Sequence, residues 1–437
     1  MAHPFVADSN VLHRALIAKP EKVIASSGIS LILESGKHVI DASAGPAVSV
    51  LGHTRPDVTE ALINQMSECA YIYSGARFAS PVVEELASFI LQGQPGGLSK
   101  AIFVNSGSEA TDAAIKLATQ YWHELGHSQR RIVIAREQSY HGNTIGALCV
   151  SGHNSRRALY SDWLSSNVQF VEPCFSYRFK RRNESDKDYV KRLAEQLENL
   201  ILELGPENIS SFIAETVSGT TLGCVPAVKG YFKTIRAICD KYNILLILDE
   251  IMCGMGKTGT MHAWEQEDIR GPDIQTIGKA LGGGFVPLSG VLLHHKIFEA
   301  LSQGSKVLAH GHTFQAHPGA CAAALAVQKA IRNEKLIAKV ADMGRVLERL
   351  LNEQIAPLNI VGDIRGRGVV NCALELGLNI LGNLGQTGTV YVDHVIISPP
   401  YIVTEEELQH IVAILRTAIM KVAEATFPQS NRGDAKK

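Results

Sequence analysis

The sequence predicts an α/β fold built on a mainly parallel sheet. Short runs rich in apolar residues at 101–104, 211–214 and 244–248 predict strands, and the unbroken run at 244–248 predicts burial on both faces. Between such runs, residues 189–204 and 226–242 place apolar side chains at helical spacing. Repeated alternation of strand and helix implies right-handed crossovers, which join parallel strands.

Size and composition are those of an ordinary globular protein. The 437 residues suffice for two domains, with 46% hydrophobic and 19% charged residues. A net charge of −1 does not favour a nucleic-acid partner, and eight cysteines without a C-x-x-C pair predict neither a zinc site nor a disulfide framework. We expect a cytoplasmic protein with no membrane partner, because no signal peptide and no apolar stretch of about 18 residues is present.

The two ends of the chain predict smaller elements. Residues 11–19 predict a short helix, and 29–33 with 38–40 predict a hairpin. A further helix is expected over 58–69. After about residue 330 the pattern changes to a helix, short strands and a last helix, which Thr404-Glu405-Glu406-Glu407 caps.

An acid and a lysine follow two neighbouring predicted strands. Asp249 comes directly after the apolar run at 244–248, and Lys279 follows a second run at 274–277. Three glycines, 282–284, then allow a tight turn beside a ligand. In a partly dry pocket the pKa of a lysine falls by roughly 3 units, which frees the neutral amine for a Schiff base. Pyridoxal 5'-phosphate suits such a site, because Asp249 can hold its pyridine nitrogen protonated.

A phosphate site is predicted after the strand at 101–104. Ser108 is placed to cap a helix that carries apolar side chains at helical spacing over 110–125. The free N–H groups and the dipole at its amino end would attract an anion. Spacing alone leaves open a plain helix cap here, and a surface ion pair for Asp249 and Lys279.

Longer stretches resemble one enzyme family. Residues 248–259, 272–274 and 278–284 resemble the class III aminotransferases of pyridoxal-phosphate fold type I, and 105–118 is similar to the phosphate-binding turn of that family. The resemblance covers roughly residues 25–425. It implies a large domain with a mainly parallel sheet and a smaller α+β domain. We therefore expect an N-terminal part of the small domain at 1–60, a large cofactor-binding domain at 61–328, and the rest of the small domain at 329–437.

The resemblance also implies roles for individual residues. The aromatic Tyr140, followed by His141, would stack on the cofactor ring, and Glu215 would lie close to the cofactor. Thr313 would reach the cofactor phosphate of the other subunit, so a homodimer with shared active sites is expected. The implied cofactor-binding set is Ser106, Gly107, Ser108, Tyr140, His141, Glu215, Asp249, Lys279 and Thr313, with Lys279 and Asp249 catalytic.

Three rival motifs carry less weight. Residues 254–258 follow a strand as a P-loop does, but the first glycine of that motif is absent. His310, His312 and His317 are not joined by a carboxylate or cysteine at ligand spacing, so no metal is predicted. The glycine-rich stretch at 362–368 lacks the register of a dinucleotide fingerprint.

The chain departs from the family pattern at three places. Lys257 stands where the family usually has arginine, and we expect this change to be mild. Fewer residues than usual separate Leu376 from Asp393, which shortens the small domain. No arginine precedes Pro399-Pro400 to bind a substrate carboxylate. The remaining candidates for that role are Arg77, Arg365 and Arg367.

The predicted function is transfer of an amino group between a small-molecule amino donor and an oxo acid or aldehyde. Lys279 would hold the cofactor and then move a proton between substrate and cofactor carbons. A racemase, a decarboxylase or an aminomutase on the same scaffold uses the same groups, and these activities remain alternatives. A non-catalytic dimer that retains the fold is a further alternative, which the presence of the lysine, the aspartate and the phosphate turn disfavours.

Overall fold

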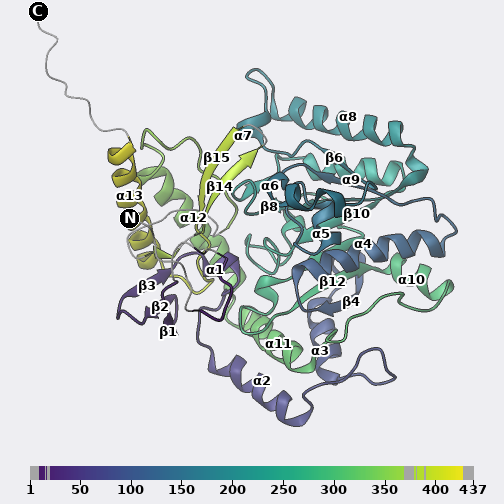
Figure 1. Ribbon diagram of the computed structural model, residues 1–437, viewed down its shortest axis with the longest axis horizontal. Helices are drawn as coiled ribbons and strands as arrows, with labels where there is room; N and C mark the ends of the chain where they lie inside the picture. Colours follow the sequence, from purple (N-terminus) through teal and green to yellow (C-terminus); the bar gives the residue numbers. More distant parts are fainter. Residues whose placement is uncertain are drawn as a thin grey trace, which may run out of the picture.

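A seven-stranded sheet forms the centre of the computed structural model, which describes residues 9–14, 16, 20–368, 378–379, 381–387 and 390–426 (Figure 1). Strand β12 runs opposite to the other six strands, so the predicted, mainly parallel α/β fold is confirmed. In spatial order the strands are β4 (Leu98–Val104), β12 (Ser289–His294), β11 (Ile274–Ile277), β10 (Leu245–Glu250), β7 (Ile209–Glu215), β5 (Ile132–Arg136) and β6 (Val168–Val171).

Alternating side chains of β10 enter two different cores. Leu245 and Ile247 pack with the apolar face of α4 (Gly107–Glu124) and with α10 (His295–Gln303). Leu246 and Leu248 pack with α8 (Asp186–Leu204) and α9 (Tyr231–Lys241) on the other face. Each fully buried leucine or isoleucine contributes about 1.5–3 kcal/mol, so an unbroken apolar strand is favoured only where both faces are covered.

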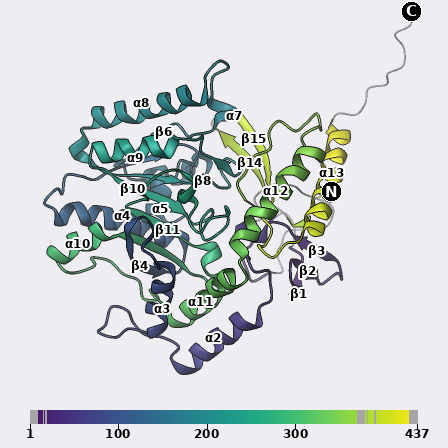
Figure 2. The same ribbon diagram turned by 180° about the vertical axis from the view of Figure 1, so that it is seen from behind.

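A second sheet joins the two ends of the chain. Strands β1 (Val23–Ser27), β2 (Ser30–Leu33) and β3 (His38–Asp41) form an antiparallel meander, and β13 (Leu378–Asn379) pairs with β3 in parallel. In both Figure 1 and Figure 2, β1 to β3 lie on the same side of the molecule as the C-terminal α13. One apolar core includes Ile29, Leu347 and Leu415. The domain boundaries near residues 60 and 328 stay a prediction.

The C-terminal part contains two long helices and a hairpin, α12 (Leu336–Gln354), α13 (Glu405–Thr426), β14 (Leu381–Thr387) and β15 (Val390–Ile396). The capping box predicted for the last helix is present, because Thr404 N donates to Glu407 and Glu407 N donates to Thr404 Oγ1. The shortened stretch between Leu376 and Asp393 lies partly outside the described residues. Its described part comprises β13 and most of this antiparallel hairpin.

Three further helices and several short elements complete the fold. Helix α11 (Pro318–Asn333) packs against α2 (Pro56–Glu68) and α3 (Pro81–Ile90). The other short elements are α1 (Ala44–Ala47), α5 (Ile145–Val150), α6 (Asn154–Arg157), α7 (Ser176–Phe179), β8 (Val217–Ser218), β9 (Val225–Pro226) and the 3₁₀ helices Pro95–Gly97, Ala158–Trp163, Pro206–Asn208, Ala263–Gln266 and Lys279–Leu281. Within the described residues, no helix is both long enough and apolar enough to cross a bilayer. The cytoplasmic location stays a prediction.

Several predicted elements have different bounds in the structure. Residues 11–14 and 16 are not helical, and the rest of the helix predicted at 11–19 lies outside the described residues. Helix α8 begins at Asp186, because Ser185 accepts a hydrogen bond from Asp188 N and caps it. Helix α9 covers less than 226–242, since β9 takes its first residues and Gly230 precedes the first turn in a left-handed conformation.

Asp273 connects the central strands to two neighbouring helices through ion pairs and a hydrogen bond. Its buried carboxylate lies 2.9 Å from Arg236 Nη1 of α9 and 2.6 Å from Lys296 Nζ of α10. It also accepts a hydrogen bond from Leu246 N at 2.7 Å. Burial alone would raise the pKa of Asp273, but Arg236 and Lys296 hold it below its ordinary value.

Asp273→Asn should lower the free energy of unfolding by about 3–5 kcal/mol at pH 7, because it leaves two cations near an uncharged group in the interior. Denaturant unfolding of the cofactor-loaded protein measures the change. The folded-state pKa lies below the unfolded value of about 3.9, so the stabilisation is complete above that value and is lost as the pH falls through the folded pKa. The defect should therefore shrink in acid. Asp268→Asn, at an exposed ion pair with Lys233, is the matched control and should leave unfolding unchanged. An equal effect of both variants would contradict this role.

Candidate active site

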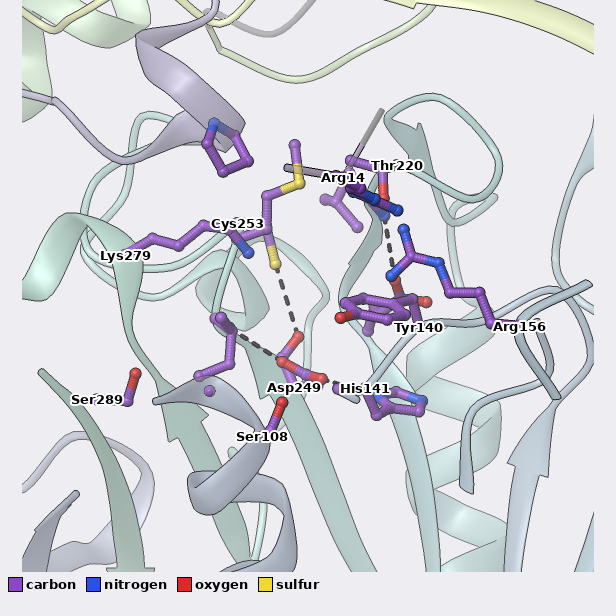
Figure 3. Close-up of a pocket in the computed structure, with 18 residues that line it drawn as sticks. Arg14, Ser108, Tyr140, His141, Arg156, Thr220, Asp249, Cys253, Lys279 and Ser289 are labelled. Atoms are coloured by element: carbon purple, nitrogen blue, oxygen red, sulfur yellow. Dashed lines mark hydrogen bonds and ion pairs between the residues drawn. The ribbon is translucent and has the colours of Figure 1, made fainter. Parts of the chain in front are cut away.

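A cavity of about 400 Å³ opens at the carboxyl ends of the central strands (Figure 3). This is the edge at which open α/β sheets bind ligands, and the size suits a small cofactor with a substrate. Seven of the nine predicted site residues line this cavity, and Ser106 and Thr313 do not. The seven are Gly107, Ser108, Tyr140, His141, Glu215, Asp249 and Lys279.

Lys279 enters the cavity from the turn after β11. Gly278 permits this turn, because a Cβ at that position would lie 2.5 Å from Ser289 Oγ. Lys279 itself has φ of 43°, a left-handed conformation that is uncommon for a residue with a side chain. Its half-buried side chain lines the cavity, and desolvation lowers the pKa of the amine. Asp249 partly opposes that shift.

Asp249 lies near the carboxyl end of β10 and also lines the cavity. Its Oδ2 accepts a hydrogen bond from His141 Nδ1 at 2.7 Å, and both side chains are buried. Oδ1 accepts from Ile251 N at 3.0 Å and from Thr276 Oγ1 at 3.2 Å. The backbone of His141 is held in turn by Thr111, whose hydroxyl donates to its carbonyl at 2.7 Å. The acid therefore has a fixed orientation, and both of its oxygens accept hydrogen bonds.

Glu215 lies at the end of β7, beside Asp249. Burial raises the pKa of Glu215, and the charges of His141 and Arg136 oppose the shift. Its Oε1 accepts a hydrogen bond from Gly219 N at 3.2 Å, and Oε2 lies 3.8 Å from Arg136 Nη2. Arg136 is itself buried and donates to the Glu215 carbonyl at 2.6 Å, so this arginine belongs to the protein interior.

The first turn of α4 lies at the cavity, but its cap differs from the prediction. Ser106 is the N-cap, because its hydroxyl accepts from Glu109 N at 3.2 Å. The Ser108 cap predicted from the sequence is wrong, since Ser108 is already inside the helix and its hydroxyl accepts from Asn143 N at 2.9 Å. Backbone N–H groups without helical partners remain at this helix end, next to Gly107 and Ser108, and such groups can bind an anion.

Two walls of the cavity are flat or apolar. Tyr140 and Ile251 both line the cavity. The guanidinium of Arg156 lies over the Tyr140 ring, 4.5 Å from its centre. Sequence reasoning missed Arg156 and also Arg14, which lines the same cavity. Neither belongs to a recognisable motif, and their position depends on how α6 and the N-terminal segment fold back onto the sheet.

The arginines suggested by the sequence are not at the cavity. Arg365 donates to the carbonyls of Leu222 and Gly223 and pairs with Asp363, all within 2.8 Å. Arg367 pairs with Glu267 at 2.6 Å. Arg77 is exposed and does not line the cavity, so none of the three faces a substrate within this subunit.

Thr313 also lies outside the cavity of its own subunit. It is exposed, and its carbonyl accepts a hydrogen bond from Tyr71 Oη at 2.8 Å. In the part of the chain described here, His310, His312 and His317 do not belong to any metal-binding group of three or more His, Cys, Asp or Glu side chains.

Lys257 is buried away from any anion site. Its Nζ hydrogen-bonds to Ser398 Oγ at 3.1 Å and lies over the Tyr401 ring at 4.8 Å. Burial lowers the pKa of this amine to about 7. The glycine-rich turn before it therefore does not present a lysine to a nucleotide, which argues against the P-loop interpretation. A dinucleotide fingerprint would open a helix, but residues 362–368 form none.

The residues present fit pyridoxal phosphate. A partly dehydrated amine matches its aldehyde, an oriented carboxylate matches its pyridine nitrogen, and the helix N-terminus matches its phosphate. His141 Nε2 and Glu215 Oε2 are buried polar atoms without a hydrogen-bond partner, as expected where a polar ligand completes the site.

Comparison with known proteins agrees with this chemistry. The family model described as aminotransferase class-III matches residues 18–419. An uncharacterized aminotransferase of Schizosaccharomyces pombe is 40% identical over 93% of this chain and 94% of its own length. The putrescine–pyruvate aminotransferase of Pseudomonas aeruginosa is 31% identical over 95% of this chain and 94% of its own. The omega transaminase of Pseudomonas jessenii, solved in complex with PMP, superposes with a TM-score of 0.87 at 29% identity, over 94% of both chains.

Fold and site thus define a pyridoxal-phosphate-dependent transferase of fold type I. The chain belongs to the class III aminotransferase family. It is an aminotransferase, and its cofactor is pyridoxal 5'-phosphate.

Asp249→Asn should lower the pKa of Lys279 further, because Asp249 is the main charge that favours its ammonium form. The pH dependence with which an amine-directed reagent modifies Lys279 in cofactor-free protein measures this shift. Asp268→Asn, at an exposed site, is the control and should not move the profile. A profile for Asp249→Asn that is unchanged or displaced to higher pH would contradict the electrostatic coupling.

Proposed function

We propose that the protein transfers an amino group between a small-molecule amino donor and an oxo acid or aldehyde, with Lys279 as its catalytic lysine. The observation that carries this proposal is the arrangement of three groups around one cavity. The Lys279 amine, the Asp249 carboxylate and the first turn of α4 all face the same space. Each matches a different part of one cofactor, and spacing along the chain would not bring them together by itself.

The protein's own groups divide the work. When bound, pyridoxal phosphate supplies a carbonyl and an electron-withdrawing ring. Lys279 would hold that carbonyl through its neutral amine and would move a proton at the substrate carbon. Asp249 would face the pyridine nitrogen and keep it protonated, and His141 orients Asp249 through the 2.7 Å hydrogen bond.

The remaining predicted residues position the cofactor. Ser106, Gly107 and Ser108 supply the anion-binding turn for the phosphate, where a helix N-terminus contributes about 1 kcal/mol or less in exposed settings. Tyr140 stacks on one face of the ring, and Ile251 covers the other. Stacking adds about 0.5–1.5 kcal/mol beyond burial. Glu215 adds a polar group to the cavity lining beside Asp249, and it accepts a hydrogen bond from Gly219 N.

Two features favour amino transfer over other reactions of the scaffold. Relatives that are named aminotransferases align with nearly the whole length of this chain. The Pseudomonas aeruginosa relative is named for an amine donor, putrescine, and an oxo-acid acceptor, pyruvate. We propose the same general pairing here, an amine or amino acid with an oxo acid or aldehyde.

Borohydride reduction tests the assignment of Lys279. In cofactor-saturated protein, reduction should fix the cofactor to Lys279, and peptide mapping should find the adduct there. Lys279→Ala should lower turnover by roughly 100-fold or more, since positioned proton transfer alone contributes about 10²–10⁴-fold. Lys187→Ala, an exposed lysine on α8, is the matched control. An adduct at another lysine, or none, would remove the central assignment.

We also propose that the functional unit is a homodimer in which Thr313 completes the neighbour's phosphate site. Its exposure, and its absence from the cavity of its own subunit, support this assignment. Thr313 lies beside an exposed aromatic surface, since Tyr71 contacts Phe314 edge to face with ring centres 5.8 Å apart. Tyr71 is 42% and Phe314 56% exposed in the single subunit. Exposed apolar side chains gathered in one place indicate an interaction surface.

Mixed dimers test the shared site. If Thr313 acts across the subunit boundary, a Lys279→Ala chain paired with a Thr313→Ala chain gives one site with both defects and one intact site. Activity should then be about half that of wild type, because one of two sites is complete. If Thr313 acts within its own subunit, each site carries one defect. Activity no higher than the mean of the two parent homodimers would defeat the proposal.

A further inference from the structure

Arg156 presents a positive charge to the active-site cavity. It lies in α6, between the buried α5 and the exposed 3₁₀ helix at Ala158–Trp163. The guanidinium covers the face of Tyr140 with its carbon 4.5 Å from the ring centre, and the side chain is half-buried. A flat cation on an aromatic ring keeps its N–H groups at the rim free to point at a ligand.

No acid of the described residues neutralises this charge. Arg156 forms no ion pair there, and the two acids that line the cavity are already engaged. Asp249 pairs with His141, and Glu215 lies between Arg136 and Gly219. His153, next to Arg156, is held uncharged, because burial and the Arg156 charge lower its pKa to about 4. The positive charge therefore remains available to an anion in the cavity.

The adjacent arginine shows the contrast. Arg157 uses one nitrogen, Nη1, to donate to the carbonyls of Leu148, Cys149 and Ser151 within 3.0 Å. Those contacts tie α6 to the end of α5, which is a structural task. Among the described residues the Arg156 side chain donates to no backbone carbonyl, so the contacts of the fold do not account for its charge.

The position of Arg156 is separate from the predicted phosphate site. In the view of Figure 3, Arg156 lies with Arg14 and Thr220 in the upper part of the cavity, and Ser108 lies in the lower part. Arg14 lines the same cavity from the N-terminal segment, and its side chain is exposed. Two guanidinium groups thus line the cavity in addition to the predicted phosphate site.

We propose that Arg156 is the specificity-determining residue that binds the carboxylate of the oxo-acid substrate, with Arg14 adding attraction at the mouth of the cavity. This inference rests on the proposed function and deepens it, because it selects oxo acids over neutral aldehydes as acceptors. Arg156 replaces, from a different element, the arginine that is missing before Pro399-Pro400. A guanidinium suits this task because its two parallel N–H groups match a carboxylate.

Pyruvate and acetaldehyde form the matched pair of probes, since they differ by one carboxylate. Relative kcat/KM for these acceptors should fall by roughly 10- to 100-fold in Arg156→Gln, the range expected when a hydrogen bond to a charged group is lost. The ratio should fall less in Arg156→Lys, because lysine keeps the positive charge but lacks the two parallel N–H donors of the guanidinium. Arg14→Gln should have a smaller effect, since an exposed charge is screened by solvent. Arg182→Gln, at an exposed position far along the chain, is the control and should leave the ratio unchanged.

Equilibrium binding supplies a readout that does not need turnover. Propionate should change the visible absorption of the cofactor-loaded protein, and the neutral propionamide should not. Arg156→Gln should weaken propionate binding by a factor similar to its effect on the kinetic ratio. The spectrum also reports whether each variant is folded and keeps its cofactor.

The outcomes separate this inference from the proposed function. An equal loss with pyruvate and acetaldehyde, or weaker cofactor binding with an unchanged ratio, would overturn the role of Arg156. Turnover by the wild-type protein with aldehydes but with no oxo acid would overturn it too, while the proposed function would stand. Absence of turnover with every donor and acceptor would instead contradict the proposed function, and propionate binding that is independent of Arg156 would then contradict the inference.

Discussion

The buried carboxyl group of Asp249 is the constraint on which the site depends. It lies near the end of a strand whose side chains are covered on both faces, and a polar group without partners in such a position costs several kcal/mol. The surrounding loops therefore have to supply donors. His141 comes from the loop after β5, Ile251 from the turn after β10, and Thr276 from β11. Satisfying this one group aligns three segments around the cavity.

Lys279 has the opposite environment on the same cavity. Within the described residues it has no ion-pair partner, so desolvation is not cancelled and the pKa of the amine falls. Lys257 shows that a lowered pKa is not sufficient for this chemistry. Its pKa is about 7 for the same reason, but Ser398 and Tyr401 enclose its amine away from the cavity. A reactive lysine needs both an uncharged amine and open space in front of it.

The fold and the inner part of the site were predictable from local patterns. The unbroken apolar run before Asp249 has few other solutions than a strand covered on both faces, and the glycines around Lys279 imply a tight turn. The cap of α4 was placed at Ser108 instead of Ser106, because both serines precede the same apolar stripe and only backbone geometry distinguishes them. The residues of the upper cavity were not predictable. Arg156 and Arg157 are neighbours of the same type, and their different contacts depend on how α6 packs against α5.

A crystal structure of the cofactor-loaded protein would test the central claim most directly, that Lys279, Asp249 and the first turn of α4 hold one molecule of pyridoxal phosphate. We expect continuous electron density from Lys279 Nζ to the cofactor, the pyridine nitrogen within hydrogen-bond distance of Asp249, and the phosphate at Ser106 to Ser108. A cofactor bound elsewhere, or one whose phosphate lies away from α4 with Asp249 unoccupied, would contradict the account.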